Sequence, residues 1–194
     1  MSQRVYNLFQ KSVEAKMQVG EELAPLIDQA GDMLVNALLA DKKILVCGNG
    51  TSSALAQIFT SSLLDRYEKE RPSLPAIWLG STVSTYTAIA ADYNYSDIYA
   101  KPIRALGQQG DVLLALSSSG NSANLISAVS AAHERGVNVV ALTGRDGGDL
   151  STLMEVNDLE ICAAVNSRGR IHEIHLLVLF CLCDLIDNKL FGIE

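Results

Sequence analysis

The most constraining feature of this sequence is a unit that recurs along the chain: a short apolar run, a turn, and then a segment with helical periodicity. The apolar runs do not alternate with polar residues, which is typical of parallel strands buried on both faces. Strands that alternate with helices at this spacing predict an α/β fold in which helices cover both faces of a parallel sheet. We predict strands at residues 44–47, 76–79, 111–116, 137–142 and 158–163.

Apolar residues at helical spacing predict the elements between and before these strands. Residues 3–39 predict two amphipathic helices, with Pro25 in the first turn of the second. We therefore divide the chain into an N-terminal helical arm, residues 1–40, that packs on a single domain, residues 41–194. Further helices are predicted at residues 51–67, 83–91, 95–106, 123–135 and 170–190.

Composition narrows the class of protein. The chain has 194 residues, of which 48% are hydrophobic, enough for one domain with a buried core. Its formal net charge is −7. An acidic chain repels a polyphosphate backbone, so we expect no direct binding of nucleic acid. The net charge does not argue against a local site for one small anion.

The cysteine pattern, the N-terminal segment and the longest apolar run together predict a cytoplasmic protein. Its cysteines form no C-x-x-C motif and are expected to be reduced thiols, mostly in the core. The first 16 residues lack the apolar run of a signal peptide. The most apolar run, residues 174–183, is far shorter than the ~20 residues of a membrane span. The four cysteines are Cys47, Cys162, Cys181 and Cys183.

A glycine-rich turn follows the first predicted strand, at residues 48–53. In parallel sheets, ligands bind beyond the carboxyl ends of the strands. Glycine lets the backbone approach a ligand closely, and the N-terminus of the next helix offers free N–H groups to an anion. The turn is neither a Walker A loop nor a complete G-x-G-x-x-G motif. Taken alone, it could equally be a turn with a Ser or Thr helix cap.

A second polar turn follows the third predicted strand, at residues 117–122, and holds four serines and an asparagine. One residue is enough to cap a helix, so the other hydroxyls are in excess of what capping requires. Neither turn contains Lys or Arg. We therefore expect binding through neutral donors and helix dipoles, which suits a sugar monophosphate better than a nucleoside triphosphate.

Five segments resemble the phosphoheptose isomerase family of sugar-isomerase (SIS) proteins, in order and over essentially the whole chain. They are CGNGTS, ERPSLPA, GDVLLALSSSGNS, VVALTGRDGG and CLCDLIDNKLF. The resemblance implies a SIS-type, doubly wound, five-stranded parallel sheet with an N-terminal helical arm, and a homotetramer. It also implies a phosphosugar site at Asn49, Gly50, Thr51, Ser52, Asp92, Ser117, Ser118, Ser119, Ser122 and His172.

The resemblance also identifies positions that differ from those of the active isomerases. Active members use a zinc ion and an acid/base pair to move a proton between C1 and C2 of sedoheptulose 7-phosphate. A His and a Glu of that set align with Ile58 and Ser62, and a second His aligns with Phe180. Ile and Phe can neither titrate nor bind a metal ion. We therefore predict no catalytic residue, no metal site and no cofactor, with zinc expected only if the chain is an isomerase.

Because these catalytic residues are missing, the chain most resembles a non-catalytic branch of the family, the DnaA initiator-associating proteins (DiaA). The function predicted from this resemblance is a regulator that binds the replication initiator DnaA and promotes timely initiation of chromosome replication, with a retained phosphosugar pocket. The branch's partner surface aligns with Leu190 and Phe191, which could equally be ordinary helix packing. No membrane partner is expected.

Two other functions stay open. One is an active, zinc-dependent sedoheptulose 7-phosphate isomerase, and the other is a sugar-phosphate sensor. His172 and His175 lie one helical turn apart and could rebuild a metal site, while Asp92 and Glu173 are possible bases. The last helix is apolar nearly all round and is expected at a subunit interface.

Overall fold

Five parallel strands form a single sheet in the order β2-β1-β3-β4-β5, within a computed structural model that describes residues 2–192. This confirms the predicted five-stranded SIS-type α/β fold. The long first helix confirms the helical N-terminus. The strands are β1 (Ile44–Gly48), β2 (Ala76–Trp78), β3 (Val112–Leu116), β4 (Asn138–Gly144) and β5 (Leu159–Ala163).

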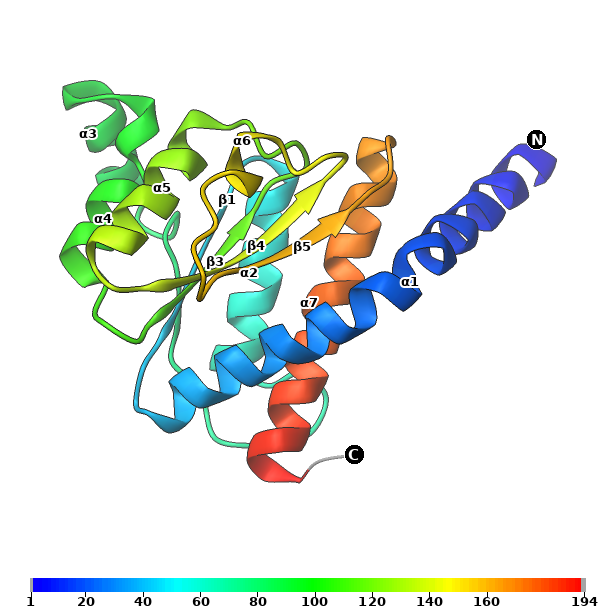
Figure 1. The fold of residues 1–194 in the computed structure, drawn as a ribbon, viewed down its shortest axis with the longest axis horizontal. Coiled ribbons are helices and arrows are strands. Elements are labelled where there is room, and N and C mark those ends of the chain that lie inside the picture. The colour runs from blue at the N-terminus through cyan, green and yellow to red at the C-terminus, as the bar shows by residue number, and fades with distance from the viewer. Residues whose placement is uncertain (1, 193–194) are drawn as a thin grey trace.

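Helices cover both faces of the sheet (Figure 1). The helices α1, α2 and α7 lie on one face, and α3, α4 and α5 lie on the other. Their bounds are α1 (Ser2–Leu39), α2 (Thr51–Leu64), α3 (Val83–Asp92), α4 (Ala100–Leu106), α5 (Ala123–Glu134), α6 (Gly148–Ser151) and α7 (Arg168–Phe191), with a short 3₁₀ turn at Tyr95–Asp97.

Two apolar cores explain why the strands carry no polar alternation. In β1, Ile44 and Val46 belong to the core beneath α2 and α7, whereas Leu45 and Cys47 belong to the core beneath α4 and α5. Successive side chains of a strand point to opposite faces, so a sheet covered on both sides needs apolar residues at every position. All five residues of β1 and of β3 are buried.

The prediction of two helices over residues 3–39 is wrong, because α1 is one helix of 38 residues with Pro25 inside it. Buried side chains hold the helix against the body on both sides of the proline: Val19 and Leu23 before it, Ala30 and Leu34 after it. This packing, against α7 and β5, outweighs the hydrogen bond that a helix loses at proline. The first half of α1 projects away from the body (Figure 1).

A buried arginine joins the end of α2 to α7. Arg71 donates from Nε to Asp187 Oδ1 at 2.9 Å, and its side chain and that of Asp187 are 1% and 5% exposed. Its other nitrogens donate to the carbonyls of Ser62 and Leu63, at 2.6 and 2.7 Å. The last carbonyls of a helix have no partner within it, so Arg71 satisfies them and fixes the following connection to α7.

No helix within residues 2–192 is long and apolar enough to cross a bilayer.

Replacement of Asp187 by Ala should be strongly destabilising, because it leaves a buried guanidinium without its counter-charge. We expect the free energy of unfolding to fall by ~3–5 kcal/mol, measured by urea denaturation. The control is Glu70→Ala, which breaks an exposed ion pair with Arg66 and should cost at most ~1 kcal/mol. Equal losses in the two variants would contradict the structural role of the buried pair.

Candidate functional site

The strand order places the two polar turns side by side. The chain leaves β1 towards β2 on one side, while β3 lies on the other side of β1, so the connections diverge between β1 and β3. In open parallel sheets, this switch point is where ligands bind. The N-terminus of α2 follows β1 and that of α5 follows β3, so the free N–H groups of both helices meet at this edge.

A cavity of about 270 Å³ lies at this switch point. It brings together six of the predicted site residues, from both turns, with two arginines from outside the turns. None of the described residues that line it is acidic. The lining residues are Asn49, Ser52, Leu116, Ser117, Ser118, Ser119, Ser122, Leu125, Arg145 and Arg168.

The expectation of neutral donors alone is wrong, because Arg145 and Arg168 line the cavity. Arg145 comes directly after β4, and Arg168 is the first residue of α7, after β5. Both arginines lie outside the two polar turns, which contain no Lys or Arg themselves. Since β4 lies beside β3 and β5 lies beside β4, the same rule about carboxyl ends applies to both arginines.

The first turn is held in place by hydrogen bonds from the body. The side chains of Asn49 and Asn124 exchange two hydrogen bonds, both of 2.8 Å, and Asn124 is buried in the first turn of α5. The hydroxyl of Tyr99, which is 1% exposed, donates to the carbonyl of Gly48 at 2.5 Å. Asn49 therefore links the first turn to the start of α5, the helix that follows the second turn, and this leaves little of its amide free for a ligand.

The second turn is fixed by a close backbone approach. Ser117 Oγ accepts the N–H of Gly120, which has a φ of +69°. A Cβ atom at Gly120 would lie 1.7 Å from the carbonyl oxygen of Gly147, so only glycine fits there. This contact holds the serine turn against the turn that carries Arg145.

The other predicted site residues do not line this cavity. Gly50 lines a second cavity of about 320 Å³ beside it, together with Tyr86 and Tyr99. Thr51 and Asp92 are exposed and line neither cavity. His172 stands one helical turn along α7 from Arg168.

Three titratable side chains at the start of α7 differ in what they can do. Burial and the charge of Arg168 lower the pKa of His172, and neither of its ring nitrogens has a hydrogen-bond partner within the described residues. Burial lowers the pKa of His175 to about 4, and its Nε2 lies 2.7 Å from the carbonyl of Thr143. Burial opposes the shift at Glu173, but hydrogen bonds from Ser12 and Arg170 lower its pKa, which makes it a weak base.

The three positions at which the sequence resemblance implies zinc-site residues, Ile58, Ser62 and Phe180, do not fit a metal ion. Ser62 Oγ donates to the carbonyl of Ile58 within α2, and the ring of Phe180 lies 5.6 Å from that of Tyr67. Within residues 2–192, no three His, Cys, Asp or Glu side chains gather in a group that could hold a metal ion.

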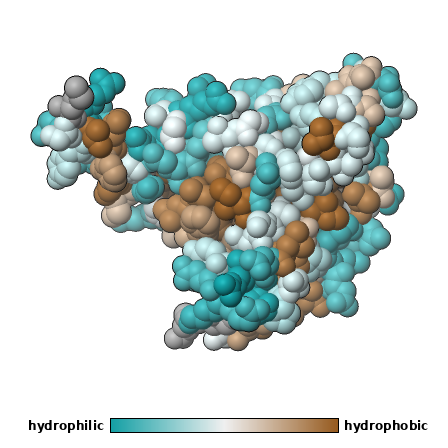
Figure 2. Space-filling model, turned by 180° about the vertical axis from the view of Figure 1, so that it is seen from behind, coloured by the Kyte–Doolittle hydropathy of each residue, from teal (hydrophilic) through white to brown (hydrophobic). Residues whose placement is uncertain are grey.

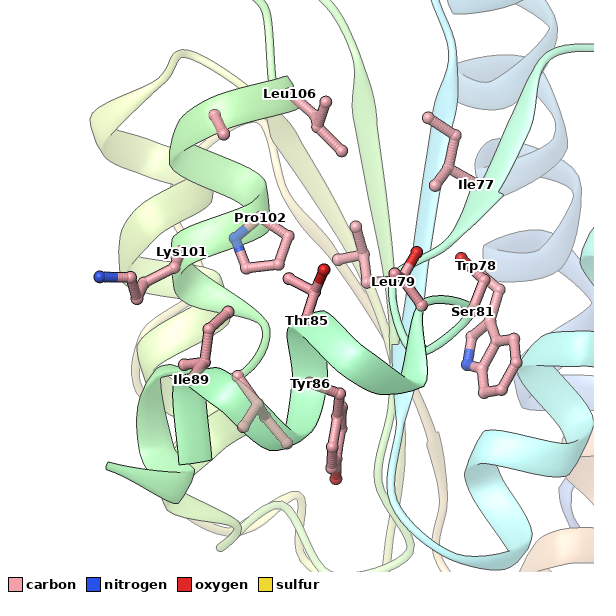
Figure 3. Close-up of a pocket in the computed structure, with 13 residues that line it drawn as sticks. Ile77, Trp78, Leu79, Ser81, Thr85, Tyr86, Ile89, Lys101, Pro102 and Leu106 are labelled. Carbon is pink, nitrogen blue, oxygen red and sulfur yellow. The ribbon is translucent and has the colours of Figure 1, made fainter. Parts of the chain in front are cut away.

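A larger, apolar cavity of about 450 Å³ lies apart from the polar turns, between β2, α3 and α4 (Figure 3). Its single charged lining residue, Lys101, has its ammonium 3.2 Å from the centre of the Tyr93 ring. Figure 3 shows Lys101 pointing away from the cavity, towards solvent. This cavity therefore offers no charge to a phosphate.

Comparison with known proteins identifies the family of this chain. The SIS domain profile matches residues 8–144. The phosphoheptose isomerase of Chromohalobacter salexigens is 53% identical, over 97% of this chain and 96% of the relative. The chain belongs to the phosphoheptose isomerase family of SIS-domain proteins. The phosphoheptose isomerase of Shewanella denitrificans is 52% identical, over 98% of this chain and 97% of the relative.

Solved structures of the family have the same fold. A phosphoheptose isomerase from Francisella tularensis superposes with a TM-score of 0.93 at 43% identity, over 96% of this chain and 98% of that one. The phosphoheptose isomerase of Neisseria gonorrhoeae gives a TM-score of 0.91 at 40% identity, over the same shares of the two chains.

The prediction of a non-catalytic, DnaA-binding regulator is wrong on these comparisons. Relatives about half identical over nearly the whole chain are named phosphoheptose isomerases, which favours the isomerase alternative. The prediction rests on three positions, Ile58, Ser62 and Phe180, whereas the similarity to the isomerases extends over nearly the whole chain. Leu190, predicted to bind the partner, packs partly buried against the core, and Phe191 is 37% exposed.

The paired amides of Asn49 and Asn124 provide a test of the site's construction. Asn49→Ala and Asn124→Ala should each weaken binding of sedoheptulose 7-phosphate, and the double variant should bind little worse than either. The reason is that each single change removes the same pair of hydrogen bonds. The coupling energy between the two residues should therefore be about 0.5–3 kcal/mol. Calorimetric titration measures this, with Asn36→Ala, an exposed change on α1, as the control. Strictly additive losses would show that the two amides do not act together.

Proposed function

We propose that this chain is a phosphoheptose isomerase, which interconverts an aldose phosphate and a ketose phosphate such as sedoheptulose 7-phosphate. The observation that carries the proposal is the cavity at the β1/β3 switch point, where two helix N-termini, serine hydroxyls and two guanidiniums converge. The names of its relatives support the same reaction. The phosphorylated sugar substrate is thus matched by a polar, cationic cavity.

The phosphate end of the substrate would lie on the serine turn. Ser118, Ser119 and Ser122 present hydroxyls to the cavity, and the first turn of α5 adds backbone N–H groups. Such donors hold an anion without needing to move when it binds. Anchoring the phosphate leaves the carbonyl end of the sugar free to be positioned for proton transfer.

Isomerisation moves one proton between C1 and C2, with no net oxidation, and therefore requires a base beside the sugar. We assign this base to His172. Its lowered pKa keeps the imidazole neutral near pH 7, and a neutral ring nitrogen can accept a proton. Because neither ring nitrogen is hydrogen-bonded within the described chain, the ring can turn towards the cavity without losing a hydrogen bond.

We assign no step of the isomerisation to a zinc ion. The donor set of the described residues does not fit the ion, since Ile58 and Phe180 are apolar and Ser62 is hydrogen-bonded within its own helix. The proton transfer is therefore assigned to the protein's own side chains.

The test is turnover of sedoheptulose 7-phosphate beside an active family member. We expect turnover in the wild type, and a fall in kcat of about 10²–10⁴-fold in His172→Asn. Wild-type activity should fall below pH 6.5 as His172 gains a proton, since its pKa is lowered from 6.5, and the variant should lack this acid limb. Absence of turnover in a folded wild type that still binds the sugar would refute the isomerase.

His133→Asn is the matched control, because it also removes an imidazole. That imidazole lies on α5 and is bound to Asp158, unlike His172 on α7. Its kcat should stay at the wild-type level, with the melting temperature of each variant measured alongside. A His172→Asn variant with wild-type kcat would mean that another group is the base.

We further propose that the chain assembles as a homotetramer through the projecting half of α1. Six large apolar side chains there are 47–72% exposed, more than a single copy leaves in water without cost. Figure 2 shows apolar residues along the projecting arm and on the adjoining surface of the body. The six are Val5, Tyr6, Leu8, Phe9, Val13 and Met17.

Light scattering should give a mass four times the 20.8 kDa of one chain. Phe9→Asp should lower that mass, because it places a carboxylate on the apolar face. Val156→Asp places the same carboxylate at an apolar residue that is 97% exposed in a loop, and it should leave the mass unchanged. A wild-type monomer at micromolar concentration would contradict the assembly.

A further inference from the structure

Two arginines of the cavity have no partner in the described chain. Arg145 and Arg168 are exposed, line the same cavity, and form neither a hydrogen bond nor an ion pair through their side chains within residues 2–192. Four other arginines are each paired with a carboxylate: Arg66 with Glu70, Arg71 with Asp187, Arg104 with Glu134, and Arg170 with Glu173. Since no described acidic residue lines the cavity, the natural counter-charge for the two free guanidiniums is a ligand.

The order of the strands separates two kinds of donor along the cavity. The turns with Asn49 and Ser117–Ser122 follow β1 and β3 and supply hydroxyls, amides and helix N-termini. Arg145 and Arg168 follow β4 and β5, the next two strands along the same edge. The uncharged donors of the two turns fix the shape of the binding site, and the two arginines supply its positive charge.

The backbone at Arg145 supports a role for its side chain. Its φ is +64°, in the left-handed region that non-glycine residues rarely adopt. The N–H of Arg145 donates to the carbonyl of Ala163, and the following turn packs against Gly120, so the surroundings maintain this conformation. Such outliers persist where the structure holds them and are frequent at binding sites.

We propose that Arg145 and Arg168 together bind the phosphoryl group as its dianion, and that this pair makes the site selective for a phosphate monoester over a neutral sugar or a singly charged ester. Guanidinium groups match tetrahedral oxyanions with two parallel hydrogen bonds. Two positive charges balance the two negative charges of an ionised phosphate. The inference rests on the proposed function only in that the ligand is a phosphorylated sugar.

Binding of the phosphate at Arg168 would also affect His172, the proposed base. Arg168 and His172 are four residues apart on α7 and share one face of the helix. A phosphate dianion on Arg168 would reduce the positive field that His172 feels and would make the imidazole a stronger base. Ligand charge and proton transfer are then coupled through one turn of α7.

The test compares two probes that share a sugar and a tetrahedral group but differ in charge: sedoheptulose 7-phosphate and its 7-sulfate analogue. Calorimetric titration gives their dissociation constants in the wild type, Arg145→Gln, Arg168→Gln and the double variant. We expect the phosphate to bind about 10- to 100-fold more weakly in each single variant. The wild type should prefer phosphate to sulfate, and the double variant should not.

Arg66→Gln is the matched control, because it removes the same charge from an exposed site outside the cavity. It should leave both dissociation constants unchanged, and Arg145→Lys should restore part of the lost affinity. Gln variants that keep wild-type affinity, or a double variant that keeps its preference for phosphate, would overturn the inference.

The outcomes separate this inference from the proposed function. Charge-selective binding without turnover would refute the isomerase and support the arginine pair. Turnover with an unchanged preference for phosphate in the double variant would refute the arginine pair alone. Failure of the folded wild type to bind either probe would overturn both.

Discussion

The change in the direction of the strand connections between the parallel strands β1 and β3 is the constraint on which the rest of the site depends. It places the N-termini of α2 and α5 next to each other, so that both helices direct free N–H groups towards one point. Two like dipole ends repel each other, so a join between them has to hold them together. The reciprocal amides of Asn49 and Asn124 provide that join across the switch point, and Tyr99 holds the first turn from beneath. The cavity is thus built before any ligand arrives.

The sequence was sufficient for the sheet but not for the whole site. Its strands could be predicted because each is apolar at every position, a pattern that two covered faces impose. The continuity of α1 could not, because Pro25 is a local signal and the packing on either side of it is a tertiary one. Arg145 and Arg168 were missed for a related reason: they reach the cavity from β4 and α7, and only the strand order makes them neighbours of the serine turn.

The helix α7 links stability to chemistry. Its first turn carries Arg168 at the cavity, its second carries His172, and near its end Asp187 pairs with the buried Arg71. Arg71 in turn satisfies the last carbonyls of α2, the helix whose first turn lines the cavity. A change in the position of α7 would therefore move a cavity cation, a titratable group and an interhelical ion pair together.

The charge of the whole molecule and the charge of the site have opposite signs. A chain with a net charge of −7 repels a phosphorylated sugar at long range, and the repulsion is weakened by salt within about 10 Å. Inside that distance, the potential is set by two helix N-termini and by two guanidiniums that have no counter-charge among residues 2–192. The long-range repulsion also acts on nucleic acids, whose many phosphates cannot all enter one cavity. A small dianion can, so local placement of two arginines gives selectivity that composition alone does not reveal.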